Sequence, residues 1–345
     1  MSISSHPVPV RSPARLLGLI AAVAILLGAC SGSTGSASPD TSASAAAVAA
    51  PTAVPSASGT PAPTPTPAPS YPITVTDDQG TAVTIVSTPL KIASLTPAAT
   101  EILFKIGAGP RVVAKAEDID PFPPEADALP IVSTFKGIDI ERIVALEADL
   151  VIADSLNPPD AITQLRGLGL PVIVLAASSI DAALHDVELV GDVVGAGAAA
   201  REVTASMRAR FEQLSAVATG LSKPRVFYEI GAGDTIYTVP GESIYAEMLR
   251  LAGSDPITTD SSYVISLEKL LAADPEVILV GDLTPVADVA ARPGWKGMTA
   301  VKDGAIVLVN DTIVTRPGPR LVDGLAALIT AIHPDVVVPS PVPAT

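Results

Sequence analysis

Residues 140–153, Ile-Glu-Arg-Ile-Val-Ala-Leu-Glu-Ala-Asp-Leu-Val-Ile-Ala, have a gapless counterpart at residues 267–280, Leu-Glu-Lys-Leu-Leu-Ala-Ala-Asp-Pro-Glu-Val-Ile-Leu-Val. Acidic, basic and apolar positions fall in the same order in both segments. Each segment has the pattern of a short amphipathic helix followed by a buried strand. Any such helix and strand look partly alike, but a match at all fourteen positions favours two similar α/β lobes.

Strand and helix patterns alternate on both sides of this repeat, which predicts α/β layering with mainly parallel strands. A long helical pattern over residues 198–218 separates the two copies, and about 20 residues at ~1.5 Å each give a helix close to 30 Å long. We expect this helix to join the lobes. Strands are predicted at residues 91–95, 112–114, 150–153, 171–175 and 226–230, and helices at 97–107, 140–146, 161–167 and 181–194.

The N-terminus has the pattern of an export signal. Arg11 and Arg15 precede an apolar run over residues 16–26, which ends in Leu-Gly-Ala-Cys at residues 27–30. The four residues resemble the lipobox of bacterial lipoproteins, in which the cysteine carries a diacylglycerol and becomes the mature N-terminus. Cys30 is therefore the expected lipidation site. The alternative is an uncleaved anchor that happens to contain a cysteine.

Composition limits what the rest of the chain does. Residues 31–70 are almost entirely Ala, Ser, Thr, Pro, Gly and Val, which is typical of a disordered linker. A net charge of −15 argues against a nucleic-acid partner. Beyond Cys30 the chain has no thiol, and beyond the signal it has two distant histidines, so no metal site is expected. The predicted organisation is a signal peptide at 1–30, a linker at 31–70, an N-terminal lobe at 71–195, a connecting helix at 196–222, a C-terminal lobe at 223–335 and a disordered tail at 336–345.

Between about residues 91 and 333 the chain resembles a known family, the class III substrate-binding proteins of ABC importers for vitamin B12, iron-siderophores and haem. Within that family it is most similar to the vitamin B12 binders. The resemblance implies two Rossmann-like lobes, a ligand cleft between them and one long rigid connecting helix. The segments that carry it are residues 92–103, 133–144, 225–228, 241–243 and 316–320.

Ligands of α/β lobes bind beyond the carboxyl ends of the strands, so the loops that follow the predicted strands are the expected cleft lining. Phe135 stands where the B12 binders carry a tryptophan that stacks on the corrin, and an aromatic face suits a flat macrocycle. Tyr237 and Tyr263 each offer a flat face and a hydroxyl for an amide or a chelate oxygen. The alternative for Phe135 is a loop aromatic that covers the core of its lobe, and a structural role is equally open for both tyrosines.

Three further ligand contacts are expected at strand ends. Thr96 follows the first predicted strand and also suits the N-cap of the next helix. Arg316 offers paired hydrogen bonds to an anionic or amide-rich ligand, and its alternative role is a solvated loop charge. Asp154 and Ile119 stand where the B12 binders have, or would use, an aromatic residue. These two departures leave a siderophore or another chelate open.

Glu141 and Glu242 match, by resemblance, the acidic residues at the lobe tips that meet arginines of the permease subunits. One carboxylate on each lobe would set the register on a two-fold symmetric permease. From the sequence alone, Glu141 is a favourable charge in the first turn of a helix, and Glu242 is an ordinary turn residue.

The expected function is therefore that of a monomeric, lipid-anchored substrate-binding protein on the outer face of the bacterial cytoplasmic membrane. It would capture a corrinoid such as cobalamin and deliver it to an ABC permease dimer. The alternatives are a ferric siderophore or haem as ligand, and a sensing lipoprotein without a transport role. No catalytic motif or cofactor motif is present, so an enzyme is not expected and no cofactor is predicted.

Overall fold

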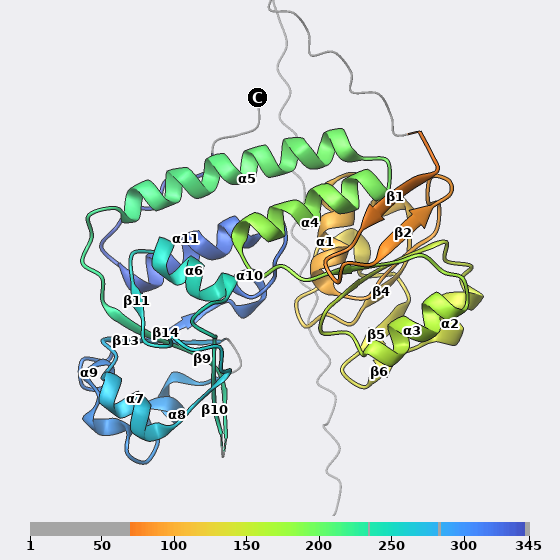
Figure 1. Cartoon of the computed structure of the whole chain (residues 1–345). Coiled ribbons are helices and arrows are strands. Elements are labelled where there is room, and N and C mark those ends of the chain that lie inside the picture. Colours follow the sequence, from red (N-terminus) through yellow and green to blue (C-terminus); the bar gives the residue numbers. More distant parts are fainter. Residues whose placement is uncertain (1–69, 234, 282–283, 342–345) are drawn as a thin grey trace, which may run out of the picture. The chain divides into compact units, whose positions relative to one another are not determined.

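The structure, a computed structural model, describes residues 70–233, 235–281 and 284–341 (Figure 1). The predicted signal peptide with Cys30, nearly all of the predicted linker and the last four residues of the tail lie outside the described residues. Among the helices of the described part, none is both long and apolar enough to cross a membrane.

The N-terminal lobe is built on a six-stranded sheet with the strand order β6-β5-β4-β3-β7-β8. All neighbouring pairs are parallel except β5 with β6. The first strand of the sheet, β3, lies in the middle, so the chain winds outward first to one side and then to the other. This order creates a crevice where the carboxyl ends of β3 and β7 diverge. The strands are β3 (Ile92–Ser94), β4 (Val112–Ala116), β5 (Ile131–Thr134), β6 (Gly137–Ile138), β7 (Leu150–Asp154) and β8 (Val172–Leu175).

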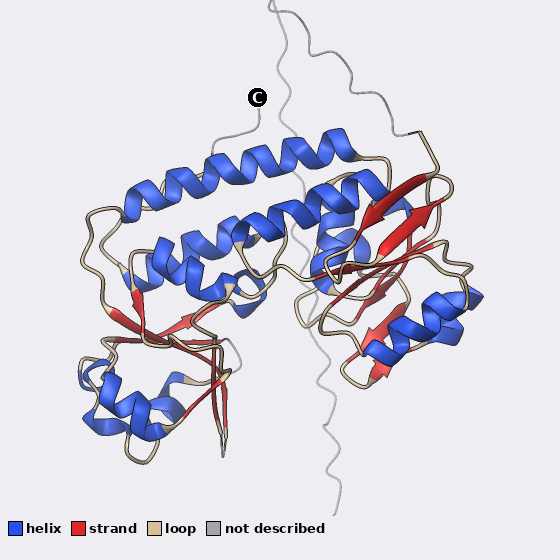
Figure 2. Cartoon of the chain, viewed as in Figure 1, coloured by secondary structure: helices blue, strands red, loops and turns tan. Residues whose placement is uncertain are grey.

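Helices cover both faces of this sheet (Figure 2). One face packs on α1 and α4, and the other on α2 and α3. A hairpin of β1 (Ile73–Thr76) and β2 (Ala82–Ile85) precedes the sheet and buries Val83 and Ile85 in the core beneath α1. The helices of this lobe are α1 (Pro97–Lys105), η1 (Gly109–Arg111), η2 (Pro124–Ala126), α2 (Ile140–Ala145) and α3 (Pro159–Gly167).

The C-terminal lobe has a second sheet in the order β12-β10-β9-β13-β14, with β11 paired to β9. Strands β9, β11, β13 and β14 are parallel, whereas β10 runs antiparallel to both of its neighbours, β9 and β12. The strands are β9 (Arg225–Ala232), β10 (Ile236–Thr238), β11 (Asp255–Pro256), β12 (Val264–Ile265), β13 (Val277–Gly281) and β14 (Ile306–Val309). The helices are α6 (Ile244–Leu251), α7 (Leu267–Ala273), α8 (Val286–Ala291), η3 (Trp295–Gly297), α9 (Thr299–Lys302), α10 (Asp311–Val314) and α11 (Leu321–Ile332).

The sequence repeat occupies equivalent positions in the two sheets. Helix α2 leads into β7, which lies beside β3, and helix α7 leads into β13, which lies beside β9. Both helices begin at a polar cap, because Asp139 accepts from the amide of Arg142 and Ser266 accepts from the amide of Lys269. The α/β architecture with two Rossmann-like lobes is confirmed.

Two helices join the lobes. Helix α5 (Gly197–Ala218), green in Figure 1, buries Ala200 in the core of the N-terminal lobe and Phe211 in that of the C-terminal lobe. Helix α4 (Ile180–Val193) also contributes to both cores, through Leu184 on one side and Val190 on the other. The two helices pack so closely that a Cβ on Gly191 would lie 2.3 Å from the Cβ of Ala200. The sequence predicted one connecting helix, and the structure adds a second beside it.

Candidate functional site

Large apolar side chains are exposed at the carboxyl ends of the parallel strands in the N-terminal lobe. Ile119 follows β4, Phe135 follows β5 and Leu156 follows β7. Phe135 is 93% exposed and Leu156 is 87% exposed, so neither contributes to the core of its lobe. The exposure of Phe135 contradicts the alternative in which it covers that core. Side chains of this kind at one sheet edge form an apolar surface that a ligand can cover.

The C-terminal lobe has a matching set at the carboxyl end of β9. Tyr237 pairs with Gly231 near the end of this strand and with Val264 of β12, which places Tyr263 at the same edge. The side chains of Ile230, Tyr237 and Tyr263 are each 40% exposed or more. Both predicted tyrosines therefore offer aromatic surface at the sheet end where a ligand is expected.

Thr96 lies at the crevice between β3 and β7, but its side chain is buried and has a structural contact. Its hydroxyl oxygen accepts a hydrogen bond from the amide of Ala99 at 3.2 Å, which caps helix α1. The neighbouring loop is tied to it by Asn157, whose side-chain amide donates to the carbonyl of Leu95 at 3.4 Å. In this structure, then, Thr96 shapes the crevice wall through helix α1.

Asp154 lies at the carboxyl end of β7, where its charge reaches a tyrosine of the C-terminal lobe. Burial raises the pKa of its carboxyl, although the amide of Leu156 donates to it at 2.8 Å. The phenol of Tyr245 in α6 has a pKa raised to about 12, first by burial and then by the charges of Tyr263 and Asp154. Tyr245 also donates to the carbonyl of Thr315 at 3.2 Å. Asp154 of one lobe and Tyr263 of the other therefore lie near a common tyrosine, which the sequence did not single out.

Arg316 is held in a buried ion-pair network rather than exposed in a loop. Its Nη1 donates to Glu101 Oε1 and to Asp118 Oδ2, each at 3.0 Å, and its Nη2 donates to Asp118 Oδ1. The side chain of Arg316 is 12% exposed, and that of Glu101 is 1% exposed. The alternative of a solvated loop charge is therefore wrong. Its partners belong to the N-terminal lobe, so Arg316 crosses from one lobe to the other.

Arg320, four residues further along the same loop, strengthens the same contact. Its Nε and Nη2 donate to the two carboxylate oxygens of Glu101 at 3.1 and 2.7 Å, and Asp120 lies 3.8 Å from its Nη1. Its guanidinium also lies 4.1 Å from the centre of the Phe122 ring. Although burial opposes the charge, Glu101, Asp120 and Asp118 raise the pKa of Arg320 above its usual value. We call this set, Glu101, Asp118, Asp120, Arg316 and Arg320, the interlobe clasp.

The sequence contained a partial signal for the interlobe clasp. Arg316 and Arg320 are four residues apart in Arg-Pro-Gly-Pro-Arg, and Asp118 and Asp120 lie in a loop expected to line the cleft. Glu101 gave no such signal, because it is one acidic residue in an amphipathic helix. Only the packing of helix α1 against the C-terminal lobe brings it to the arginines.

Glu141 and Glu242 are both exposed, as docking residues need to be. Glu141 lies in the first turn of α2, and Glu242 lies in the turn before α6. Within the described residues, neither carboxylate takes part in an ion pair.

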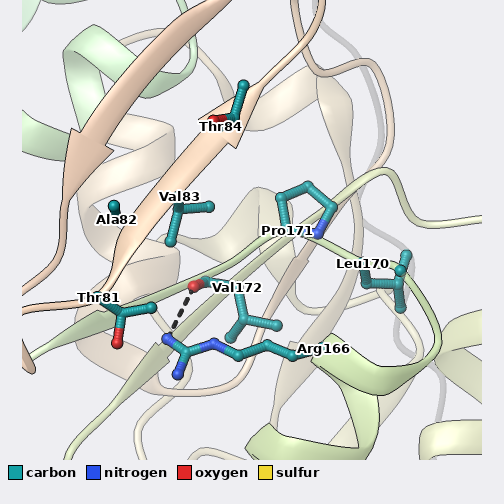
Figure 3. A pocket seen from close by; sticks show the side chains of 9 residues that line it. Thr81, Ala82, Val83, Thr84, Arg166, Leu170, Pro171 and Val172 are labelled. Carbon is teal, nitrogen blue, oxygen red and sulfur yellow. Dashed lines mark hydrogen bonds between the residues drawn. The ribbon is translucent and has the colours of Figure 1, made fainter.

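A shallow pocket of about 240 Å³ lies elsewhere, between strand β2 and the start of β8 (Figure 3). Arg166 lines it, but its Nη2 donates to Asp77 at 2.7 Å and to the carbonyl of Val172 at 3.2 Å. The cation is thus already compensated, and none of the exposed aromatic residues lines this pocket. No cluster of metal-ligating side chains occurs among residues 70–233, 235–281 and 284–341.

Comparison with known proteins agrees with this arrangement. Residues 92–312 match the family of periplasmic binding proteins. The chain is 30% identical to an uncharacterised ABC transporter substrate-binding lipoprotein, YvrC, of Bacillus subtilis, over 77% of this chain and 87% of the relative. It is 31% identical to a cobalamin-binding protein of Halobacterium salinarum, over 76% of this chain and 75% of the relative.

A solved structure has the same fold. The periplasmic vitamin B12-binding protein BtuF of Vibrio cholerae superposes with a TM-score of 0.63 at 26% identity, over 71% of this chain and 97% of BtuF. The fold is thus that of the class III periplasmic binding proteins, which bind solutes and do not catalyse a reaction. The chain belongs to the periplasmic binding protein family and is the substrate-binding component of an ABC transporter, working outside the cytoplasm.

Proposed function

We propose that the protein is a lipid-anchored receptor that binds a corrinoid between its two lobes and hands it to an ABC permease dimer. Cys30, outside the described residues, would carry the lipid on the outer face of the cytoplasmic membrane, and residues 31–70 would be the tether. The folded lobes would act as a monomer that moves within reach of the permease.

One observation carries the proposal, namely the exposed apolar and aromatic side chains at the strand ends of both lobes. Phe135 and Leu156 of one lobe and Tyr237 and Tyr263 of the other supply flat and apolar surface, which suits the faces of a macrocycle. The tyrosine hydroxyls and Asp154 supply hydrogen-bonding groups for peripheral amides. Relatives named as cobalamin-binding and vitamin B12-binding proteins support a corrinoid as the first choice.

A second candidate is a ferric siderophore or haem. The fold also occurs in the haem-binding protein RhuT of Roseiflexus, with a TM-score of 0.64 at 25% identity over 70% of this chain and 99% of RhuT. Asp154 and Ile119 lack the aromatic surface expected for a corrin ring, which favours this candidate. A sensing lipoprotein that binds the same ligand without a permease is a further alternative.

Ligand titration tests the proposal. The purified full-length protein in detergent is dialysed to equilibrium against cyanocobalamin, haem, ferrioxamine B and ferric dicitrate, and bound ligand is measured by absorbance. We expect saturable 1:1 binding of cyanocobalamin. Replacing Phe135 and Tyr237 by alanine should weaken binding at least tenfold, because each stacked aromatic contributes about 0.5–1.5 kcal/mol beyond its buried area. The double variant Tyr71→Ala, Phe104→Ala, at partly buried sites on the N-terminal lobe, controls for loss of aromatic residues. Saturable binding of none of the four ligands would refute the receptor function.

Docking on the permease makes a separate prediction. Glu141 and Glu242 lie on different lobes and are the proposed contacts to permease arginines. Replacing both by alanine should lower uptake by at least tenfold while leaving ligand affinity unchanged, because exposed interfacial charges act on the partner and not on the cleft. The control is Asp160→Ala with Glu268→Ala, two exposed carboxylates, one on each lobe. Glu268 is the counterpart of Glu141 in the sequence repeat. Equal uptake by wild type and the Glu141/Glu242 variant would remove the docking role.

A further inference from the structure

The interlobe clasp borders the surface at which the ligand is proposed to bind. Asp118 and Asp120 alternate with exposed Ile119 in the loop after β4, and Phe122 of the same loop lies under Arg320. On the other lobe, Arg316 follows β14 and α10 at the carboxyl end of the sheet. Thr312 extends the contact, since its hydroxyl donates to Asp120 at 3.0 Å.

Both guanidinium groups of the interlobe clasp are hydrogen-bonded to carboxylates of the N-terminal lobe. Arg316 and Arg320 together make five hydrogen bonds to Glu101 and Asp118, with Asp120 close by. The arginine side chains are at most 15% exposed. Three carboxylates face two guanidinium groups, so the clasp as a whole carries an excess negative charge.

The remaining charges at these strand ends are mostly negative. In the loops at residues 117–124, 135–139, 154–157, 231–237 and 310–320, the only cation besides the clasp arginines is exposed Lys136. Acidic residues in the same loops are more numerous: Glu117, Asp118, Asp120, Asp139, Asp154 and Asp311. A negatively charged ligand group buried here would meet mostly like charges, and the two guanidinium groups of these loops are already bonded to carboxylates, which leaves the exposed ammonium of Lys136 as the one other cation in these loops.

We infer that the interlobe clasp makes this receptor selective against anionic chelates, so that it takes metal chelates whose periphery is uncharged or cationic. Glu101 and Asp118 are the specificity-determining residues, because they withdraw Arg316 from the ligand surface. The inference rests on the proposed binding surface and narrows its ligand class. It assigns amide-rich corrinoids and neutral or cationic hydroxamates to the protein, and it excludes carboxylate-rich corrinoids and citrate chelates.

Two pairs of ligands test the effect of charge at the periphery of the chelate. Dicyanocobinamide and dicyanocobyrinic acid share one macrocycle but carry amides and carboxylates, respectively. Ferrioxamine B is cationic, and ferric dicitrate is anionic. With the full-length protein in detergent, equilibrium dialysis should show binding of the amide corrinoid at least a hundredfold tighter than that of the acid. Comparable affinity for the two members of either pair would overturn the inference.

Variants test whether the clasp is the cause. Asp118→Asn and Glu101→Gln each keep a hydrogen-bond acceptor for Arg316 but remove one carboxylate charge. Either variant should bind dicyanocobyrinic acid about tenfold tighter relative to the amide, because a charge-assisted hydrogen bond to Arg316 becomes possible. Asp160→Asn removes an exposed carboxylate from α3 and should leave the acid-to-amide ratio unchanged.

The outcomes separate the inference from the proposed function. Circular dichroism and thermal unfolding identify any variant that fails to fold, and the wild-type ligand pairs then remain a complete test. An unchanged ratio in both folded clasp variants would overturn the role of the clasp. If the wild-type protein binds only ferrioxamine B, the selection against anionic chelates is supported and the assignment of a corrinoid ligand is refuted. Binding of none of the four ligands would remove the receptor function itself.

Discussion

Replacing Arg316 by methionine is expected to lower the free energy of unfolding by about 3 kcal/mol, because removing the guanidinium leaves the buried carboxylates of Glu101 and Asp118 without part of their compensating positive charge. Glu101 and Asp118 are at most 5% exposed and would lose a guanidinium that makes three hydrogen bonds to them. Arg320 still compensates Glu101 in the variant, which keeps the expected loss at the lower end of the range for buried pairs. Urea unfolding followed by far-ultraviolet circular dichroism measures the change.

Arg201→Met is the matched control. Arg201 pairs with Asp192 at 3.1 Å, but both side chains are about half exposed, so this ion pair is screened by water. Its loss should cost less than about 1 kcal/mol. Equal, small effects of the two substitutions would show that the interlobe clasp does not stabilise the folded protein.

Replacing Asp186 by asparagine is expected to remove a marked pH dependence of stability. Asp186 lies in α4 and is 1% exposed, and its Oδ1 has no hydrogen-bond partner among the described residues. Burial raises the pKa of its carboxyl to about 9, with further contributions from the hydrogen bond and the charge of Asp78. In the unfolded chain the same group titrates near its ordinary value of about 4.

The sign of the effect follows from these two pKa values. Between about pH 4 and pH 9 the folded state holds a proton on Asp186 that the unfolded state releases, so the contribution of this group to stability is most favourable below pH 4 and is lost as the pH rises toward 9. The loss approaches ~1.4 kcal/mol per pH unit for one group. Asparagine donates a similar hydrogen bond to Asp78 without titrating, so the stability of the variant should exceed that of the wild type by more at each higher pH.

Unfolding free energies at pH 5, 6, 7 and 8 test this prediction. Asp181→Asn is the control, because Asp181 is an exposed carboxylate in the first turn of the same helix. It should shift stability by a few tenths of a kcal/mol at every pH. If the difference in unfolding free energy between wild type and Asp186→Asn is the same at every pH, the pKa of Asp186 in the folded protein is not raised.

Local elements of the fold were predictable because their signals are local. Asp139, a polar residue directly before an amphipathic segment, caps α2, and Gly107 follows the end of α1 with a positive φ of 81°. The long helix was expected at 198–218 and occupies Gly197–Ala218. The shared role of α4 was not predictable, because periodicity shows which face of a helix is apolar and not which of two cores it enters.

The candidate site was predictable only where backbone position decides exposure. Phe135 follows the parallel strand β5, and Tyr237 pairs with Gly231 near the carboxyl end of β9; parallel strands bring their carboxyl ends to one edge of a sheet. Arg316 was expected to face a ligand, but it faces Glu101, which is 215 residues earlier in the chain. Pairings over such distances depend on how two lobes pack. A sequence pattern indicates the charge of a residue and leaves its partner undetermined.

The most direct test is a crystal structure of the protein with cyanocobalamin, in which anomalous scattering locates the cobalt. We predict that the cobalt lies between the carboxyl ends of β5 and β7 in one lobe and the edge formed by β9 and β10 in the other, with Phe135 and Tyr237 against the ligand. A cobalt at the β2–β8 pocket lined by Arg166, or on a surface of one lobe alone, would contradict a receptor that holds its ligand between two lobes.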